Sequence, residues 1–157
     1  MPICWTFAAY LLSLQPPHPR EVDWMTHYLL ELSLLSKPMI VVLPSLVASA
    51  AVYMARFLFL DDETEDPWPS SLSVPATHGL AQLRPVVSEL LAVLHATPNS
   101  KCNASFLKYS SESKFRGLSK LPILHNSYSL KRLAAACFGG GAGGGGLGAA
   151  SNFGPPD

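Results

Sequence analysis

The chain has 157 residues, 48% of them hydrophobic, and its formal net charge at neutral pH is zero. This length suits one domain with a modest core. The neutral charge excludes a global attraction to nucleic acid or to acidic lipid. The cysteines Cys4, Cys102 and Cys137 are widely spaced and form no C-x-x-C pair. They indicate reduced thiols in an intracellular protein, with Cys102 buried as a small apolar residue, rather than a disulfide framework.

Two short apolar patterns open the chain. The N-terminal "MPICWTFAAYLLSLQ" lacks the basic start and the cleavage motif of a signal peptide. Its apolar residues predict a helix over 5–15 that ends at the prolines 16–17. Residues 21–35 predict an amphipathic helix with acidic residues in its first turn and one buried face, formed by Trp24, Tyr28, Leu32 and Leu35.

The longest apolar run, "PMIVVLPSLVASAAVYMARFLFL", occupies residues 38–60. It predicts one helix that is apolar on every face, and such a helix is surrounded either by protein or by lipid. Pro44 is expected near its first turn, where the missing N–H costs least. Its alanines would let neighbouring helices approach closely in either setting. Arg56, near the end, is expected to reach solvent or a carboxylate.

The next segment begins with acidic residues at 61–66, and we expect a solvated loop over 61–76. Residues 80–95 predict another amphipathic helix, because leucines and valines recur at steps of three and four. Gly79 is an acceptable N-cap for it. Pro85 is expected to kink this helix or to delay its start.

The C-terminal third predicts less regular structure. Asn99 or Ser100 is expected to cap a short helix over 101–112, followed by an irregular segment. Residues 126–136 have weak helical potential. The run "GGGAGGGGLG" at 139–148 predicts a disordered tail. We therefore expect a domain over 1–124 and a flexible low-complexity tail over 125–157.

No motif indicates catalysis, a cofactor or a metal, so we assign no residue to any of these roles. The histidines His18, His27, His78, His95 and His125 never fall at i, i+4, and the acidic run lacks the ligand spacing of a calcium loop. The glycine run is followed by no Lys-Ser or Lys-Thr, so it is not a phosphate loop. The basic residues are spread over several elements, which argues against nucleic acid as a partner.

Six pieces, in order, resemble the C-terminal cyclin box of A- and B-type mitotic cyclins. Each alone is unspecific, but their order and spacing are those of the family. The pieces are "WTFAAYLL" near the start, "HYLLELSLL" at 27–35, "LPSLVASAAVYMARF" at 43–57, "WPSSL" at 68–72, "LRPVVSELLAVLH" at 83–95 and "KYSSESKFRGLSKL" at 108–121. The resemblance implies an all-α, five-helix bundle with the helix of residues 38–60 buried at its centre.

The chain also departs from the family pattern. Before the fourth helix of the box, the usual tyrosine and serine are replaced, and Gly79 stands at the cap position. No segment resembles the N-terminal cyclin box, which in the family carries most of the contact with the kinase. We therefore expect a cyclin fragment whose own kinase-binding residues are unknown.

The resemblance implies a non-catalytic regulatory subunit of a cyclin-dependent serine/threonine kinase in cell-cycle control. The expected partners are proteins only, without nucleic acid, membrane or cofactor, and the expected location is the nucleus and cytoplasm. Alone, the chain is expected to bind kinase weakly or not at all. Two alternatives stay open: a stand-alone helical interaction module, and a single-span membrane protein built on residues 38–60.

Overall fold

The computed structural model describes residues 2–60, 66–125, 131–133 and 135, and this part of the chain is helical without strands. The tail expected at 139–148 lies outside the described residues. The main helices are α1 (Pro2–Ser13), α2 (Arg20–Ser33), α3 (Pro44–Phe59), α4 (Ser70–Ala76) and α5 (Leu80–Ala96). The shorter elements are η1 (Pro38–Val41), η2 (Thr97–Asn99), α6 (Ala104–Tyr109), α7 (Glu112–Phe115), η3 (Leu118–Lys120) and α8 (Pro122–His125).

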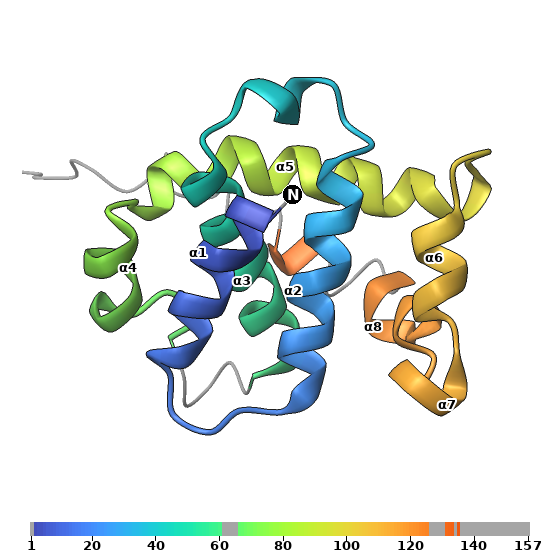
Figure 1. Ribbon diagram of the computed structural model, residues 1–157, viewed down its shortest axis with the longest axis horizontal. Coiled ribbons are helices and arrows are strands. Elements are labelled where there is room, and N and C mark those ends of the chain that lie inside the picture. Colours follow the sequence, from blue (N-terminus) through green and yellow to red (C-terminus); the bar gives the residue numbers. More distant parts are fainter. Residues whose placement is uncertain (1, 61–65, 126–130, 134, 136–157) are drawn as a thin grey trace, which may run out of the picture.

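Helix α3 is the centre of the bundle. It packs against α1, α2 and α5, and Figure 1 shows α1 and α2 on one side of it and α5 running across the back. Small α3 residues make this possible, because Ala48, Ala50, Ala51 and Ala55 are fully buried. The predicted all-α, five-helix bundle with a buried central helix is confirmed.

The N-terminal boundary predicted for this helix was wrong. The run at 38–60 is split into η1 and α3, and α3 begins only at Pro44. Leu43 precedes a proline and takes a non-helical backbone, with φ −56° and ψ 132°, because the proline ring disfavours helical geometry in the residue before it. Pro44 itself occupies the first helical turn, as expected.

Helix α2 confirms most of its predicted face. Tyr28 and Leu32 are fully buried, and Glu21 and Asp23 lie in the first turn. Leu35 was wrongly placed on this face, because the helix ends at Ser33 and leaves Leu35 exposed.

The segment expected to be a loop over 61–76 contains helix α4, which was not predicted. Its entry is fixed by Asp66, whose side chain accepts a hydrogen bond from the Trp68 backbone N–H at 2.9 Å. The Trp68 indole then donates to the backbone oxygen of His78 at 3.0 Å. These two hydrogen bonds fix the start and the end of the proline-rich segment 67–77. The apolar residues of this segment do not recur at helical spacing.

Helix α5 begins one residue after Gly79, so Gly79 is its N-cap as predicted. The Gln82 side chain accepts a hydrogen bond from the Gly79 N–H at 3.0 Å and so satisfies one free donor of the first turn. Pro85 lies inside the helix and does not delay its start.

The end of the domain is more broken than predicted. Instead of one helix over 101–112, α6 begins at Ala104 with Asn103 as its N-cap, and α7 follows separately. Cys102 was expected to be buried and is exposed, whereas Cys4 is buried. Leu133, beyond the domain boundary expected at 124, is fully buried in the core.

Arg56 does not reach solvent, which was one of the two outcomes expected for it, since only 4% of it is exposed. Its guanidinium donates to the side-chain oxygen of Gln15 and to the backbone oxygens of Asp66 and Pro67, the last at 3.1 Å. These acceptors come from the α1–α2 connection and from the segment before α4, so Arg56 links both to α3.

In the part of the chain that the structure describes, no helix combines the length and the hydropathy needed for a membrane span.

Candidate interaction surfaces

The outer face of α1 carries an apolar stripe. Ile3, Phe7, Tyr10 and Leu14 are all exposed. Ile3, Phe7 and Tyr10 step by four and three residues, which places them along one side of α1, and Leu14 directly follows the end of the helix. The opposite side, with Cys4, Ala8 and Leu11, is buried against the bundle. We call the four exposed residues the α1 stripe.

A hollow of about 250 Å³ adjoins the α1 stripe between α1, α3 and α4. Phe7 and Tyr10 form one wall, and Ser45 and Ser49 of α3 contribute hydroxyl groups. Thr77, at the end of α4, also lines it and has a left-handed backbone with φ 59°. Because a β-branched side chain is strained in that region, this rim of the hollow stores conformational energy.

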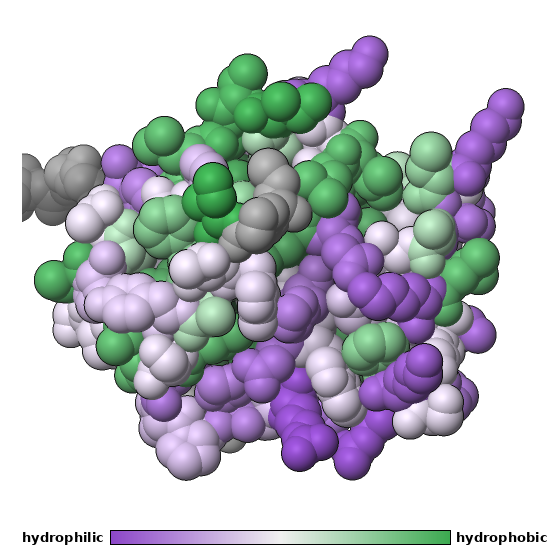
Figure 2. All heavy atoms as spheres, in the orientation of Figure 1, coloured by the Kyte–Doolittle hydropathy of each residue, from purple (hydrophilic) through white to green (hydrophobic). Residues whose placement is uncertain are grey.

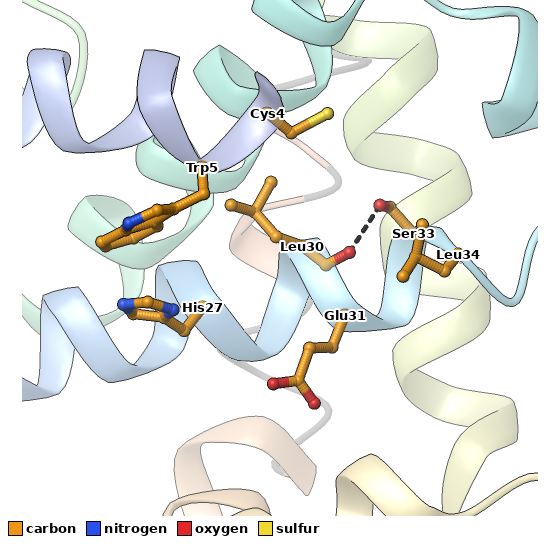
Figure 3. Close-up of a pocket in the computed structure, with 7 residues that line it drawn as sticks. All are labelled: Cys4, Trp5, His27, Leu30, Glu31, Ser33 and Leu34. Carbon is orange, nitrogen blue, oxygen red and sulfur yellow. Dashed lines mark hydrogen bonds between the residues drawn. The ribbon is translucent and has the colours of Figure 1, made fainter. Parts of the chain in front are cut away.

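A second, smaller hollow of about 130 Å³ lies between α1 and α2 (Figure 3). The rings of Trp5 and His27 stack across it, with their centroids 3.6 Å apart. Partial burial lowers the pKa of His27, and the nearby Lys108 charge lowers it further. Burial raises the pKa of the Cys4 thiol, which keeps this thiol protonated and unreactive.

Glu31 borders the same hollow but points away from α1, as Figure 3 shows. Its carboxylate accepts hydrogen bonds from Ser105 at 3.0 Å, from Tyr109 at 3.1 Å and from Lys108. Partial burial acts to raise the pKa of Glu31, but the bonds from Lys108, Ser105 and Tyr109 outweigh it and the pKa is lowered. Glu31 therefore joins α2 to α6 as an ionised acceptor.

Aromatic rings continue this junction. Tyr109 packs between Tyr28 of α2, at 4.9 Å, and Phe115 of α7, at 4.6 Å between ring centroids. Burial raises the pKa of Tyr28 and of Tyr109, so both phenols stay neutral. Arg116 forms an exposed ion pair with Glu21 at 3.2 Å. We call residues 104–120, held to α2 by these contacts, the closing segment.

The histidines noted in the sequence lie apart. His78 is buried, and its Nε2 lies 3.0 Å from the hydroxyl of Ser45. His18 pairs with Asp23 at 2.9 Å, His27 stacks on Trp5, and His95 is exposed. Within the described residues, no group of three or more potential ligands could hold a metal ion. The four described histidine side chains therefore share no site, and the exposed apolar surfaces are the candidates for function.

The α1 stripe was not predicted. The apolar residues near the N-terminus predicted a helix over 5–15 without indicating that one of its apolar faces would be exposed. The signal was present, since α1 is apolar on more than one side. When a helix has two apolar faces and only one of them packs into the core of the domain, the other face remains exposed to solvent.

Comparison with known proteins identifies the class. Residues 2–124 match the family described as "Cyclin, C-terminal domain". The chain belongs to this family, whose members are non-catalytic regulators of kinases, and it is distantly related to A- and B-type cyclins.

Individual relatives agree with this assignment. Cyclin-A2-2 of Arabidopsis thaliana is 31% identical over 101 residues, covering 64% of this chain and 22% of that protein. G2/mitotic-specific cyclin-B of Arbacia punctulata is 32% identical over 112 residues, covering 70% of this chain and 27% of that protein. The matched region thus spans only about a quarter of the length of these two relatives.

Proposed function

We propose that this chain acts as the C-terminal domain of a cyclin, the regulatory subunit of a cyclin-dependent serine/threonine kinase in cell-cycle control. Family membership supports the kinase partner in general terms. In this proposal residues 1–124 form the regulatory domain, residues 125–157 form a tail from which Leu133 packs into the core of that domain, and the site of action is the nucleus and cytoplasm. The observation that carries the proposal furthest is the α1 stripe.

The α1 stripe fits contact with another folded domain. Its four large apolar side chains are exposed next to a hollow of about 250 Å³. A continuous exposed apolar surface of this kind usually marks a contact with another protein. We assign this surface to a cyclin N-terminal box, whether on the same chain or supplied separately. Burial of the α1 stripe would hold that box in the orientation that the kinase requires.

The physical basis of regulation is differential binding. A cyclin performs no chemistry; it binds the active kinase conformer more tightly than the inactive one and thereby shifts the population. In the active conformer the catalytic Lys–Glu ion pair is formed and the activation loop is ordered. A domain that only supports the kinase-binding box contributes through the rigidity of that box, so it is expected to bind kinase weakly by itself.

Coexpression tests the proposal. The chain is produced with and without an N-terminal cyclin box from an A-type cyclin, and complex formation is measured by size-exclusion chromatography. We expect a one-to-one complex that Phe7→Asp and Tyr10→Asp abolish. Leu107→Asp is the matched control, because Leu107 is an exposed apolar residue on α6, outside the α1 stripe.

A kinase assay separates the alternatives. The reconstituted pair should raise the peptide-phosphorylating activity of a cyclin-dependent kinase above that of the N-terminal box alone, and the Phe7→Asp pair should not. Stoichiometric, activating binding of kinase by this chain alone would refute the supporting role. Indifference to the N-terminal box, with a folded chain, would favour the stand-alone interaction module.

A further inference from the structure

A second exposed apolar surface, formed by residues other than those of the α1 stripe, lies on the connection between α2 and α3. Figure 2 shows hydrophobic atoms gathered at the top of the molecule, where Figure 1 places this connection. Ile40, Val41 and Leu43 are 71%, 88% and 62% exposed. These three large apolar side chains lie within four consecutive positions and do not pack into the core. Such an exposed cluster lowers solubility, and its presence indicates a contact with a partner. We call these three residues the η1 patch.

A groove opens beside the η1 patch, between η1 and α5. Its volume is about 460 Å³, the largest of the hollows described above. Val41 and Leu43 line one side, Val86 of α5 lines the other, and Met39 is buried beneath them. The surface therefore combines projecting apolar side chains with an adjacent apolar recess.

Glu89 gives the groove a charge. It is the one charged side chain among the described residues that line the groove. The Ser36 hydroxyl donates to its Oε1 at 2.5 Å, which fixes the carboxylate at the edge of the groove. No described residue donates to its Oε2. A fixed carboxylate with an available oxygen in apolar surroundings favours a Lys or Arg side chain on whatever fills the groove.

The form of the occupant follows from the walls. They consist of helical and turn residues, and the described residues contain no strand whose edge an extended peptide could join. Peptides that bind without a sheet edge commonly lay the apolar face of an amphipathic helix into a groove of this kind. Apolar side chains spaced at i, i+3 or i+4, and i+7 would fill the recess and cover the η1 patch.

We infer that the η1 patch and the groove beside it form a docking site for an amphipathic helix of a partner protein, with one basic side chain of that helix paired to Glu89. This site is separate from the α1 stripe and does not depend on the proposed contact with an N-terminal cyclin box. It would recruit a further protein to the cyclin rather than take part in kinase activation.

Selection from a phage-displayed library of helical peptides, against the whole 157-residue chain, tests this inference. We expect enriched sequences to carry apolar residues at helical spacing with a flanking Lys or Arg. Synthetic copies are then titrated by fluorescence anisotropy. Val41→Asp should weaken binding about tenfold or more, as expected for a central apolar contact. Leu107→Asp, an equally drastic change at an exposed site on α6, should leave it unchanged.

Charge reversal gives the sharpest readout. Glu89→Lys should weaken the basic peptides and strengthen matched peptides in which glutamate replaces the basic residue. Circular dichroism of each variant confirms an intact fold. The inference is overturned if no peptide is enriched, if the enriched peptides ignore both Val41→Asp and Glu89→Lys, or if they lack a basic residue.

Two further outcomes would assign the surface to another occupant and equally overturn the inference. One is a Val41-dependent dimer of the chain in light scattering. The other is Val41-dependent flotation with vesicles of phosphatidylcholine and phosphatidylserine. Failure of this experiment leaves the cyclin-box coexpression result untouched, because that result depends on the α1 stripe.

Discussion

The phenol of Tyr109 donates a hydrogen bond to the carboxylate of Glu31 at 3.1 Å, across a sequence separation of 78 residues. Ser105 and Lys108 converge on the same carboxylate. A single α2 side chain thus holds one end of the closing segment. Tyr109 is 2% exposed, so its hydroxyl has little access to water as a substitute acceptor.

Glu31→Ala is therefore expected to destabilise the domain by about 1–3 kcal/mol, because it leaves the buried Tyr109 hydroxyl without its acceptor. Glu31→Gln keeps an acceptor oxygen and should cost less. Urea denaturation followed by circular dichroism measures both. The matched control is Glu21→Ala, which removes the surface pair with Arg116 and one first-turn negative charge and should change stability by about 1 kcal/mol or less. Equal effects at the two glutamates would contradict this role for Glu31.

Acidification should weaken the domain in two separate pH windows. The pKa of His27 is lowered from 6.5, so the unfolded state takes up this proton first, and stability begins to fall as the pH drops through 6.5. The pKa of Glu31 is lowered from 4.5, so its contribution is present above 4.5 and is lost as the pH falls through and below that value.

The two windows are assigned by substitution. Free energies of unfolding measured by urea between neutral and acidic pH should show a flatter upper window in His27→Gln and a flatter lower window in Glu31→Gln. A His27→Gln profile that parallels the wild type near pH 6.5 would show that His27 is not the group responsible.

Arg56→Met should destabilise the domain by about 1–3 kcal/mol, because it leaves the oxygen acceptors of Gln15, Asp66 and Pro67 without their donor. Arg56→Lys keeps the charge but cannot reproduce the planar set of donors, and should recover only part of the loss. Thermal unfolding of both variants measures the difference. Full recovery by lysine would mean that charge alone matters at this position.

Thr77→Gly should stabilise the domain by about 1 kcal/mol. Glycine adopts the left-handed backbone at this position without the strain of a β-branched side chain. The gain is partly offset by the greater freedom of glycine in the unfolded chain. Differential scanning calorimetry detects the shift, and Thr77→Val, which keeps the branching, is the control that should not stabilise. A destabilised glycine variant would show that the Thr77 side chain makes a contact worth more than its strain.

The sequence predicted correctly those helices in which apolar residues recur at helical spacing over several turns. Helix α5 and the buried face of α2 follow from leucines and aromatic residues at steps of three and four, and the order of the family pieces supplied their arrangement. The central position of α3 was implied by the resemblance to the cyclin box, because the apolar run at 38–60 taken alone fitted either a protein core or a membrane. The break before it was missed, because hydropathy alone does not register the restriction that Pro44 imposes on Leu43.

What the sequence could not supply depends on distant partners. Helix α4 is defined by Trp68 bonding to His78, and the closing segment by bonds to Glu31, and no local pattern reveals either. Arg56 was expected to reach solvent or a carboxylate, because charged residues are rarely buried without a partner. Its acceptors lie 41, 10 and 11 residues away and become visible only when the chain has folded.

The buried alanines of α3 limit which substitutions this domain can accept. Helices that meet over residues this small stand near the close end of the 8–10 Å range of interaxial distances. Any larger side chain at Ala50 or Ala51 must push a neighbouring helix outward and alter the domain's width. The small residues of α3 therefore fix the distances between α3 and its neighbouring helices. New binding properties must be acquired on the outer faces, where the α1 stripe and the η1 patch are found.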